Sequence, residues 1–517
     1  MQLPFGEWLP DQPDHLNPGA TVATNVYHAQ TSYKPVKGLV AYSSNNIAKN
    51  AKGAGSFRDN TNTVYTFVAT KTDIFQLDGG TFTSRKSGLT GGDTDFFTFT
   101  QFGNYVIASN GVDAPQYYLM GTSTNFANLS AIASSGTPPV FRTSGVIRDF
   151  LVTGNITNAT NRVAWSGLND IATWEAGVKS SDTQDLPGSG GQVVAITSGE
   201  VGYVFRQNQI IRMDFVGGNV IFRFSVISPN RGAVYGQTVC QDNRQIFFYA
   251  DDGFFQINGD QVLPIGAEKV NRFFENDLNK AFSDRITAAV DPFNTLAIWL
   301  YPSRQTANTT GICDRLLIYN YVTQKWTIAN VTASQIFTQF LVVNTVELMD
   351  LISENLEDIN ISLDTPYWTA GNLYLGAVDG NFKAAIFSGK NLEAELETKE
   401  TELFPGSRAN ITGVRPIVDA TSNVIVKTRD KLADTVASSS SSTINTSGIA
   451  PVRQSGRYFR ANVKIPAESI WSDAQGIDLT AAPGGSRWVI KLILIMSDTL
   501  LKQKRCFKDK WKKRSIH

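Results

Sequence analysis

The residues that could support nucleophilic or acid–base catalysis are few in this chain. The three histidines are His15, His28 and His517, and all lie near its two ends. A serine or cysteine nucleophile needs an adjacent base, most often histidine. The sequence also lacks the patterns HExxH, CxxC, GxSxG and GxxxxGK[ST]. We therefore expect no catalytic residue and no enzyme activity, unless the N-terminal region folds into a site.

Paired carboxylates are the other chemistry to consider, because glycosidases use them. Asp251-Asp252-Gly253 lies between two strongly apolar runs, where a turn stabilised by an aspartate side chain explains it better. The segment 166–170 with Trp174 weakly resembles the aspartate-box turn of sialidases but lacks the Asp-x-Gly core. The acidic segment 91–95 is too short to supply a full calcium ligand set. We interpret all three as solvated turns.

The cysteines, Cys240, Cys313 and Cys506, are too widely separated for a metal-binding cluster or a disulfide framework. We expect Cys240 and Cys313 to be small core residues. No cofactor and no metal ion are therefore predicted.

A basic segment closes the chain and differs from everything before it. It contains Lys502, Lys504, Arg505, Lys508, Lys510, Lys512, Lys513 and Arg514 against a single acid, Asp509. With Phe507 and Trp511 interleaved, it could contact DNA phosphates. A solubilising end is the simpler interpretation.

Composition indicates a large β-protein. Charged residues make up 18% of the 517, below the roughly 25% usual for soluble domains. Lysine plus arginine equals aspartate plus glutamate, 46 each, so no global field attracts nucleic acid or membranes. The N-terminus shows no signal-peptide pattern. The apolar stretch 488–501 is interrupted by charges and is shorter than the roughly 20 residues that a membrane span needs. No membrane insertion is expected.

From about residue 62, short β-branched and aromatic runs repeat between Gly, Asn and Asp turns. The repeated units cover 64–83, 96–118, 149–174, 193–226, 245–257 and 295–327, with a possible seventh at 372–387. Their spacing of about 40–50 residues is typical of a four-stranded propeller blade. The pattern predicts an all-β protein with a six- to seven-bladed β-propeller over 61–389. A series of β-sandwiches is the alternative.

Two stretches show helical spacing of apolar residues, 267–282 and 346–360, and predict short helices within the propeller region. Residues 1–60 predict an extended N-terminal arm with a few short strands. Period-two alternation after residue 390 predicts a smaller β-sandwich or platform domain over 390–487. Residues 488–517 form an apolar and then basic tail.

Several segments resemble tail nozzle or hub proteins of short-tailed bacteriophages. The first is Pro4-Phe5-Gly6-Glu7-Trp8-Leu9-Pro10-Asp11, followed by Asn17–Ala20 and Tyr33-Lys34-Pro35. Later segments that are similar cover 362–371, 387–394, 412–416, 428–430 and 455–460. The basic segment after Leu501 is not part of the shared pattern. The match covers the arm, the last blade and the C-terminal domain.

The resemblance implies a structural virion protein, synthesised in the bacterial cytoplasm and located in the tail. Six copies would form a ring below the head–tail adaptor, in contact with tail fibres or a tail-tip needle, and phage DNA would pass through the channel. A channel for DNA should be neutral or acidic, so that the polyanion slides. The zero net charge is compatible with that.

Ring closure needs a repeating heterologous interface, and the extended arm is the natural strap between subunits. Its apolar residues Phe5, Trp8, Leu9 and Tyr33 are the predicted assembly contacts. On this hypothesis, deletion of residues 1–35 leaves a soluble propeller and abolishes the ring. The alternative functions are a glycan- or receptor-binding propeller of a tail appendage and, third, a propeller glycosidase.

Overall fold

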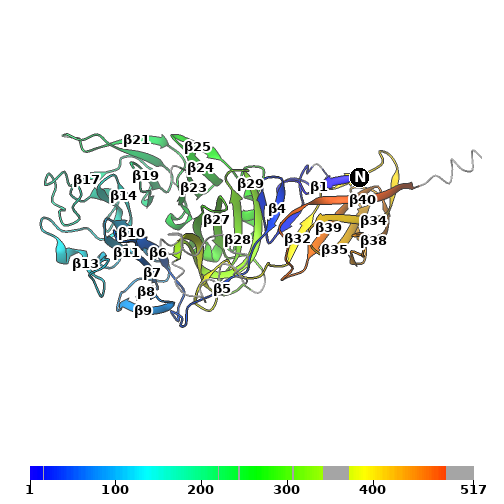
Figure 1. Cartoon of the computed structure of the whole chain (residues 1–517). Coiled ribbons are helices and arrows are strands. Elements are labelled where there is room, and N and C mark those ends of the chain that lie inside the picture. Colours follow the sequence, from blue (N-terminus) through cyan, green and yellow to red (C-terminus); the bar gives the residue numbers. More distant parts are fainter. Residues whose placement is uncertain (16, 219, 243–244, 306–307, 342–371, 485–517) are drawn as a thin grey trace, which may run out of the picture.

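The computed structural model describes residues 1–15, 17–218, 220–242, 245–305, 308–341 and 372–484. The chain is built almost entirely of strands, arranged as a large wheel of small sheets and a smaller β-sandwich beside it (Figure 1). No helix among the described residues is long and apolar enough to cross a membrane.

Five consecutive four-stranded antiparallel sheets form the first blades of the wheel, and each is a meander of sequence neighbours. Blade one contains β6 (Gly53–Arg58), β7 (Val64–Ala69), β8 (Ile74–Asp78) and β9 (Thr81–Lys86). Blade two contains β10 (Thr98–Phe102), β11 (Tyr105–Ser109), β12 (Gln116–Leu119) and β13 (Ala127–Asn128). Blade three contains β14 (Phe141–Ile147), β15 (Phe150–Ile156), β16 (Ala159–Trp165) and β17 (Asp182–Asp185). Blade four contains β18 (Val193–Ile196), β19 (Val201–Arg206), β20 (Ile210–Phe215) and β21 (Phe222–Ser228). Blade five contains β22 (Cys240–Asp242), β23 (Gln245–Ala250), β24 (Gly253–Asn258) and β25 (Gln261–Pro264).

One long strand, β29 (Lys325–Leu341), serves two blades. Its first half pairs with β28 (Cys313–Asn320) and completes blade six with β26 (Thr287–Asp291) and β27 (Leu296–Tyr301). Its second half pairs with β30 (Asn372–Asp379), and β31 (Ala384–Ile386) follows. The fourth strand of this seventh blade is β5 (Val40–Ala41), which comes from the N-terminal region. The ring is thus closed by an early and a late part of the chain.

Buried apolar side chains form seven clusters, and each junction between neighbouring blades, which we call a seam, lies in a different one. The cluster at the seam of blades five and six also continues through the core of the sandwich. Aromatic pairs cross four seams, with ring centroids about 5 Å apart: Phe67–Tyr118, Phe150–Phe222, Phe205–Phe248 and Phe254–Trp299. The other three combine Ile107 with Phe141, Ile318 with Ala377, and Phe337 with Val68. A single blade cannot cover its own faces, so closure into a ring removes this apolar surface from water. The predicted propeller is confirmed, with seven blades in the described residues.

The sandwich has two sheets and draws strands from both ends of the chain. One sheet has the order β3 (Val26–Ala29), β4 (Ser32–Pro35), β40 (Ala474–Gly484), β34 (Arg408–Val418) and β38 (Ala450–Gly456), with β1 (Gln2–Pro4) on β40. The other has β2 (Val22–Thr24), β32 (Ala394–Glu397), β39 (Tyr458–Ile465) and β35 (Asn423–Arg429). Short strands β33 (Thr401–Glu402), β36 (Ala437–Ser438) and β37 (Ser442–Thr443) pair at its margins.

The expectation of an extended arm over residues 1–60 is wrong. Four arm strands belong to the sandwich, β5 belongs to blade seven, and blade one already begins at Gly53. The arm therefore folds back on its own chain (Figure 1). The physical reason is its apolar content, because side chains such as Phe5, Trp8 and Tyr33 gain free energy on leaving water.

The single helix predicted over 267–282 is also wrong in extent. An α-helix, α1, covers only Asn271–Asp277, and a separate 3-10 helix, η3, covers Lys280–Arg285. Leu278 has an extended backbone and bridges to Ser303, and the Asn279 side chain accepts from the amide of Ala281. These local contacts interrupt the helix. Two more 3-10 turns, η1 (Leu129–Ile132) and η2 (Gly236–Thr238), lie between strands. The predicted helix at 346–360 and the predicted tail at 488–517 lie outside the described residues.

Candidate functional site

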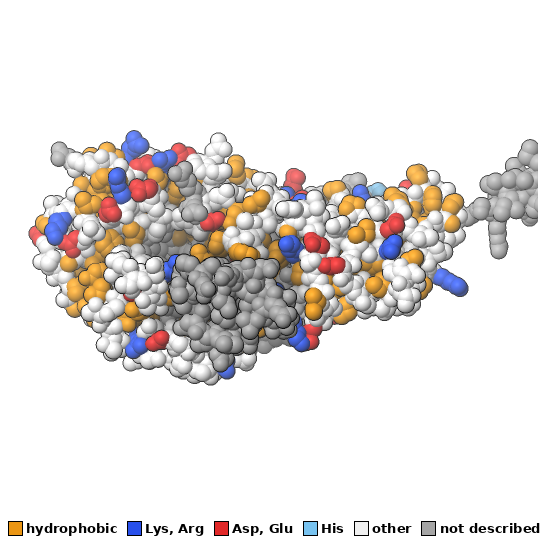
Figure 2. Space-filling view, in the orientation of Figure 1, with side chains coloured by type: hydrophobic (Ala, Val, Ile, Leu, Met, Phe, Trp, Pro, Cys, Tyr) orange, Lys and Arg blue, Asp and Glu red, His pale blue; other side chains and the backbone are white. Residues whose placement is uncertain are grey.

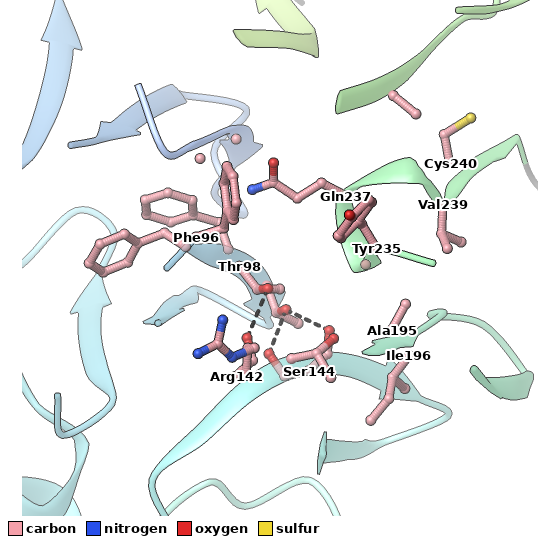
Figure 3. A pocket seen from close by; sticks show the side chains of 18 of the residues that line it. Phe96, Thr98, Arg142, Ser144, Ala195, Ile196, Tyr235, Gln237, Val239 and Cys240 are labelled. Carbon is pink, nitrogen blue, oxygen red and sulfur yellow. Dashed lines mark hydrogen bonds between the residues drawn. The ribbon is translucent and has the colours of Figure 1, made fainter. Parts of the chain in front are cut away.

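The wheel has a large central channel. It is lined by the inner strand of every blade, namely β6, β10, β14, β18, β22, β26 and the second half of β29. Its volume is about 1170 Å³. Small and polar side chains dominate its wall, as Figure 3 shows around Thr98, Ser144 and Gln237.

Hydroxyl groups on the wall of the channel bond to backbone carbonyls of the next blade. Thr98 Oγ1 donates to the Arg142 carbonyl at 3.1 Å, and Thr338 Oγ1 donates to the Val290 carbonyl at 2.7 Å. Thr100 Oγ1 lies 2.9 Å from Ser144 Oγ. Inner strands are sheet edges, and their free carbonyls need a partner. The hydroxyls therefore join neighbouring blades.

Longer amide side chains do the same work. Gln101 Nε2 donates to the Arg58 carbonyl at 2.6 Å, and Asn155 Nδ2 donates to the Val193 carbonyl at 2.8 Å. Gln237 lies in η2, just before the first strand of blade five, and its Nε2 donates to the Lys52 carbonyl at 3.2 Å. These polar groups hold the inner strands together, which is a structural role.

Acidic residues are few among the described lining residues of the channel. Asp95 and Asp284 are the acids among its described lining residues. Arg142 Nη2 lies 2.6 Å from Asp95 Oδ1. Asp93, in the same predicted acidic turn, pairs with Lys71 at 2.9 Å. Among the described residues no group of three or more His, Cys, Asp or Glu side chains could hold a metal ion.

The other acidic segments are turns. Asp170 accepts from the Ala172 amide at 2.8 Å and from Thr173 Oγ1 at 2.9 Å, and it pairs with Lys179 at 2.6 Å. Asp252 forms a forked ion pair with Arg231 at the turn between β23 and β24. Each carboxylate is thus used by its own turn or its own blade.

The two described histidines lie in the arm. The His15 ring meets the edge of Tyr458, with centroids 5.6 Å apart. His28 is buried in β3, where its Nε2 lies 3.0 Å from Lys325 Nζ. Burial and the Lys325 charge lower the pKa of His28 to about 4, so it is neutral at pH 7. Cys240 and Cys313 are buried free thiols, and burial raises the pKa of both.

The arm also forms the joint, by which we mean the contact of residues 5–25 with blades five and six. The Asp11 carboxylate accepts from the amides of Arg272 at 2.9 Å and Phe273 at 2.7 Å. These are free donors in the first turn of α1, so a residue 261 positions before Arg272 caps this helix. Glu7 pairs with Lys269 at 2.6 Å, and the Trp8 ring meets the edge of Phe273 with centroids 5.0 Å apart.

Strand β2 extends the joint, because it lies in a sheet that the propeller and the sandwich share. It is parallel to β29 of the propeller and antiparallel to β32 of the sandwich. Next to it, the Asn25 side chain accepts from the Asn330 amide at 2.7 Å and donates to the Glu393 carbonyl at 2.7 Å. Backbone hydrogen bonding therefore runs from one domain into the other without interruption.

The structure places the predicted assembly residues inside the chain. Phe5, Trp8 and Tyr33 are buried in one core cluster with the sandwich, Leu9 is half-buried, and Tyr33 Oη donates to the Gly6 carbonyl at 2.6 Å. The arm as a strap between subunits is thus corrected to an arm that joins two domains of one subunit. The predicted DNA-contacting residues, Lys502 to Arg514, lie outside the described residues.

Sequence reasoning missed the channel wall. Two inner strands, β6 and β14, are rich in small or hydroxyl side chains and lack apolar alternation. The available signal was glycine: a Cβ at Gly53 would lie 2.3 Å from the Phe97 carbonyl oxygen, and one at Gly145 would lie 3.0 Å from that of Ile196. Blades approach too closely there for a side chain.

Comparison with known proteins shows similarity at the level of structure. No family model and no curated protein matches the chain. BamB from Moraxella catarrhalis matches with a TM-score of 0.36 at 12% identity, covering 70% of this chain and 95% of BamB. The Pan2 WD40 domain of Neurospora crassa gives 0.36 at 9% identity, covering 70% and 96%. A chain of the Mitotic Checkpoint Complex gives 0.38 at 8% identity, covering 71% and 98%.

Proposed function

We propose that this chain is a non-enzymatic structural subunit of a short bacteriophage tail, one copy in a nozzle or hub ring through which the genome leaves. The ring would lie below the head–tail adaptor and contact tail fibres or a tail-tip protein. Phage DNA would pass along the axis of the ring, and the propeller would brace each subunit against its neighbour.

One observation carries the proposal: the segments that resemble tail nozzle proteins lie together in space. Residues 5–11 of the first segment belong to the joint, and Tyr33–Pro35 lies in β4. Segments 412–416, 428–430 and 455–460 lie in or beside β34, β35 and β39 of the sandwich. The segment 387–394 leads from blade seven into β32. The segment 362–371 lies outside the described residues.

This distribution supports an assembly role. A subunit common to such rings would keep its sandwich and its joint. The sequences of the blades could diverge as long as the residues at their seams stay apolar. The polar groups of the described channel wall, which hold the blades together, favour a framework over a reactive site. The joint supports the proposal further, because a subunit in a load-bearing ring needs its domains at a fixed angle.

The test is the assembly state of the purified full chain. Negative-stain images should show sixfold rings, and light scattering after size-exclusion chromatography should give a hexamer mass. Antibody-gold labelling of phage particles should mark the tail. Monomers that bind a glycan array would favour the receptor-binding alternative, and turnover of surface polysaccharide would favour a glycosidase; either result without rings would overturn the proposal.

A further inference from the structure

Two cationic side chains meet where the ring of blades closes. Lys52 immediately precedes β6 of blade one and is 8% exposed. Arg285 precedes β26 of blade six. Both line a small cavity of about 20 Å³, whose wall also includes Cys313 of blade six and Ser334 of blade seven. Three blades thus contribute to one small, partly open space.

Neither cation has a carboxylate partner within 4.0 Å in the part of the chain that the structure describes. Lys52 Nζ donates to the Asp93 carbonyl and lies 4.7 Å from the centre of the Phe96 ring. The Arg285 guanidinium donates to the carbonyls of Thr310 and Gly311, each at 2.8 Å, and stacks on a phenylalanine ring 4.6 Å away. All these partners are neutral.

The acids nearest to the two cations mostly have other partners. Asp93 is paired with Lys71 at 2.9 Å, and Asp95 is paired with Arg142 at 2.6 Å. Asp314 accepts from the amide and the hydroxyl of Ser303. Asp284 acts on Lys52 from beyond ion-pair distance. Neither Lys52 nor Arg285 is therefore neutralised by a direct carboxylate contact in the described residues.

An uncompensated charge in a poorly hydrated space is costly, and a bound counter-ion removes that cost. A water-sized occupant needs roughly 10–15 Å³, so the cavity suits one small ion and no organic ligand. We propose that the space between Lys52 and Arg285 binds a single small monovalent inorganic anion, with chloride as the probe. The anion links blade one to blade six beside the strand of blade seven that completes the ring.

An anion bound to the closed ring and not to the unfolded chain stabilises the ring by mass action. Thermal unfolding of the full chain should therefore be measured in sodium chloride and in sodium gluconate at equal ionic strength. The Tm should rise with chloride by about 1–3 °C for each tenfold increase above the dissociation constant. Gluconate, which is too large for the cavity, should give no such rise.

Lys52→Met should remove the chloride dependence. Lys49→Met is the matched control, since Lys49 is exposed, lies in the same segment and bonds to Thr72 at 2.9 Å; it should keep the dependence. If Lys52→Met does not fold, crystals of the unmodified protein in sodium bromide decide the matter by anomalous scattering. A peak between Lys52 Nζ and Arg285 supports the site. An empty cavity, or a Tm that does not change with the chloride concentration, overturns the proposed site.

Discussion

The seams of the propeller and the joint to the sandwich hold the molecule together by different means. Each seam buries apolar side chains, as where Phe150 and Trp165 of blade three meet Phe222 of blade four. The joint adds single polar contacts, such as Asp11 on α1 and Asn25 between two domains, to the apolar contact of Trp8. Apolar contacts are non-directional, whereas hydrogen bonds and ion pairs fix geometry. The ring gains stability from repetition, and the joint gains a defined orientation.

This difference predicts how substitutions and deletions in the two regions affect the fold. The propeller has seven seams, so we expect a substitution in one seam to destabilise mainly the two blades that meet there. The joint has no second copy, and its apolar part is supplied by residues far apart in the chain, such as Trp8 and Phe273. Loss of the arm should therefore affect a whole domain.

Deletion of residues 1–35 should have the largest effect. It removes Leu3, Phe5, Trp8 and Tyr33 from the core and four strands from the sandwich, and each large buried side chain is worth about 2–5 kcal/mol. We expect the sandwich to unfold and the soluble yield to fall, measured by expression and calorimetry. A synthetic peptide of residues 1–35 should restore part of the transition. A soluble truncated chain with an unchanged melting profile would contradict an arm that belongs to the core.

A matched pair of substitutions sharpens the comparison. Trp8→Ala in the joint and Phe150→Ala in a seam each remove one large buried ring, at a cost of about 3–5 kcal/mol. Hydrogen exchange should then separate them. Trp8→Ala should raise exchange in α1 and β1, and Phe150→Ala in β15 and β21. The same exchange pattern in both variants would show that seam and joint unfold as one unit.

The smallest effect concerns pH. Because the pKa of His28 is lowered to about 4 in the folded chain, the unfolded chain binds a proton more readily between about pH 6.5 and 4. The His28 contribution is complete above pH 6.5 and is lost as pH falls through this window. Urea unfolding at pH 7 and 4.5 should show a loss on the order of 1–2 kcal/mol that His28→Gln removes. His15→Gln, at an exposed position, is the control and should keep the loss.

The sequence pattern was informative where a strand is covered on both faces. Runs such as Ile246–Tyr249 and Leu296–Leu300 are continuous apolar strands, and the structure has them as β23 and β27. Their spacing also predicted the blade period. Burial of both faces leaves a strong compositional trace.

The sequence did not predict the features that depend on tertiary geometry and leave no apolar pattern. Strand β5 is two residues long, and nothing in Val40–Ala41 indicates that it pairs with β31. The division of β29 between two blades depends on an irregular register near Ala333. The arm was misread because its turns suggested an extended chain, while the burial of Trp8 depends on a partner, Phe273, that is distant in sequence. The channel wall was missed because glycine and threonine give no periodicity.

The pairing that closes blade seven also determines when the propeller can form during synthesis of the chain. Ser43, beside β5, accepts from the amide of Ala384, which is 341 residues further along the chain. At roughly 5–20 residues per second, a ribosome needs on the order of 20–70 s to make that partner. During this interval the edge of the nascent N-terminal segment that β31 will cover stays without its partner. The wheel can close only after blade seven has been synthesised.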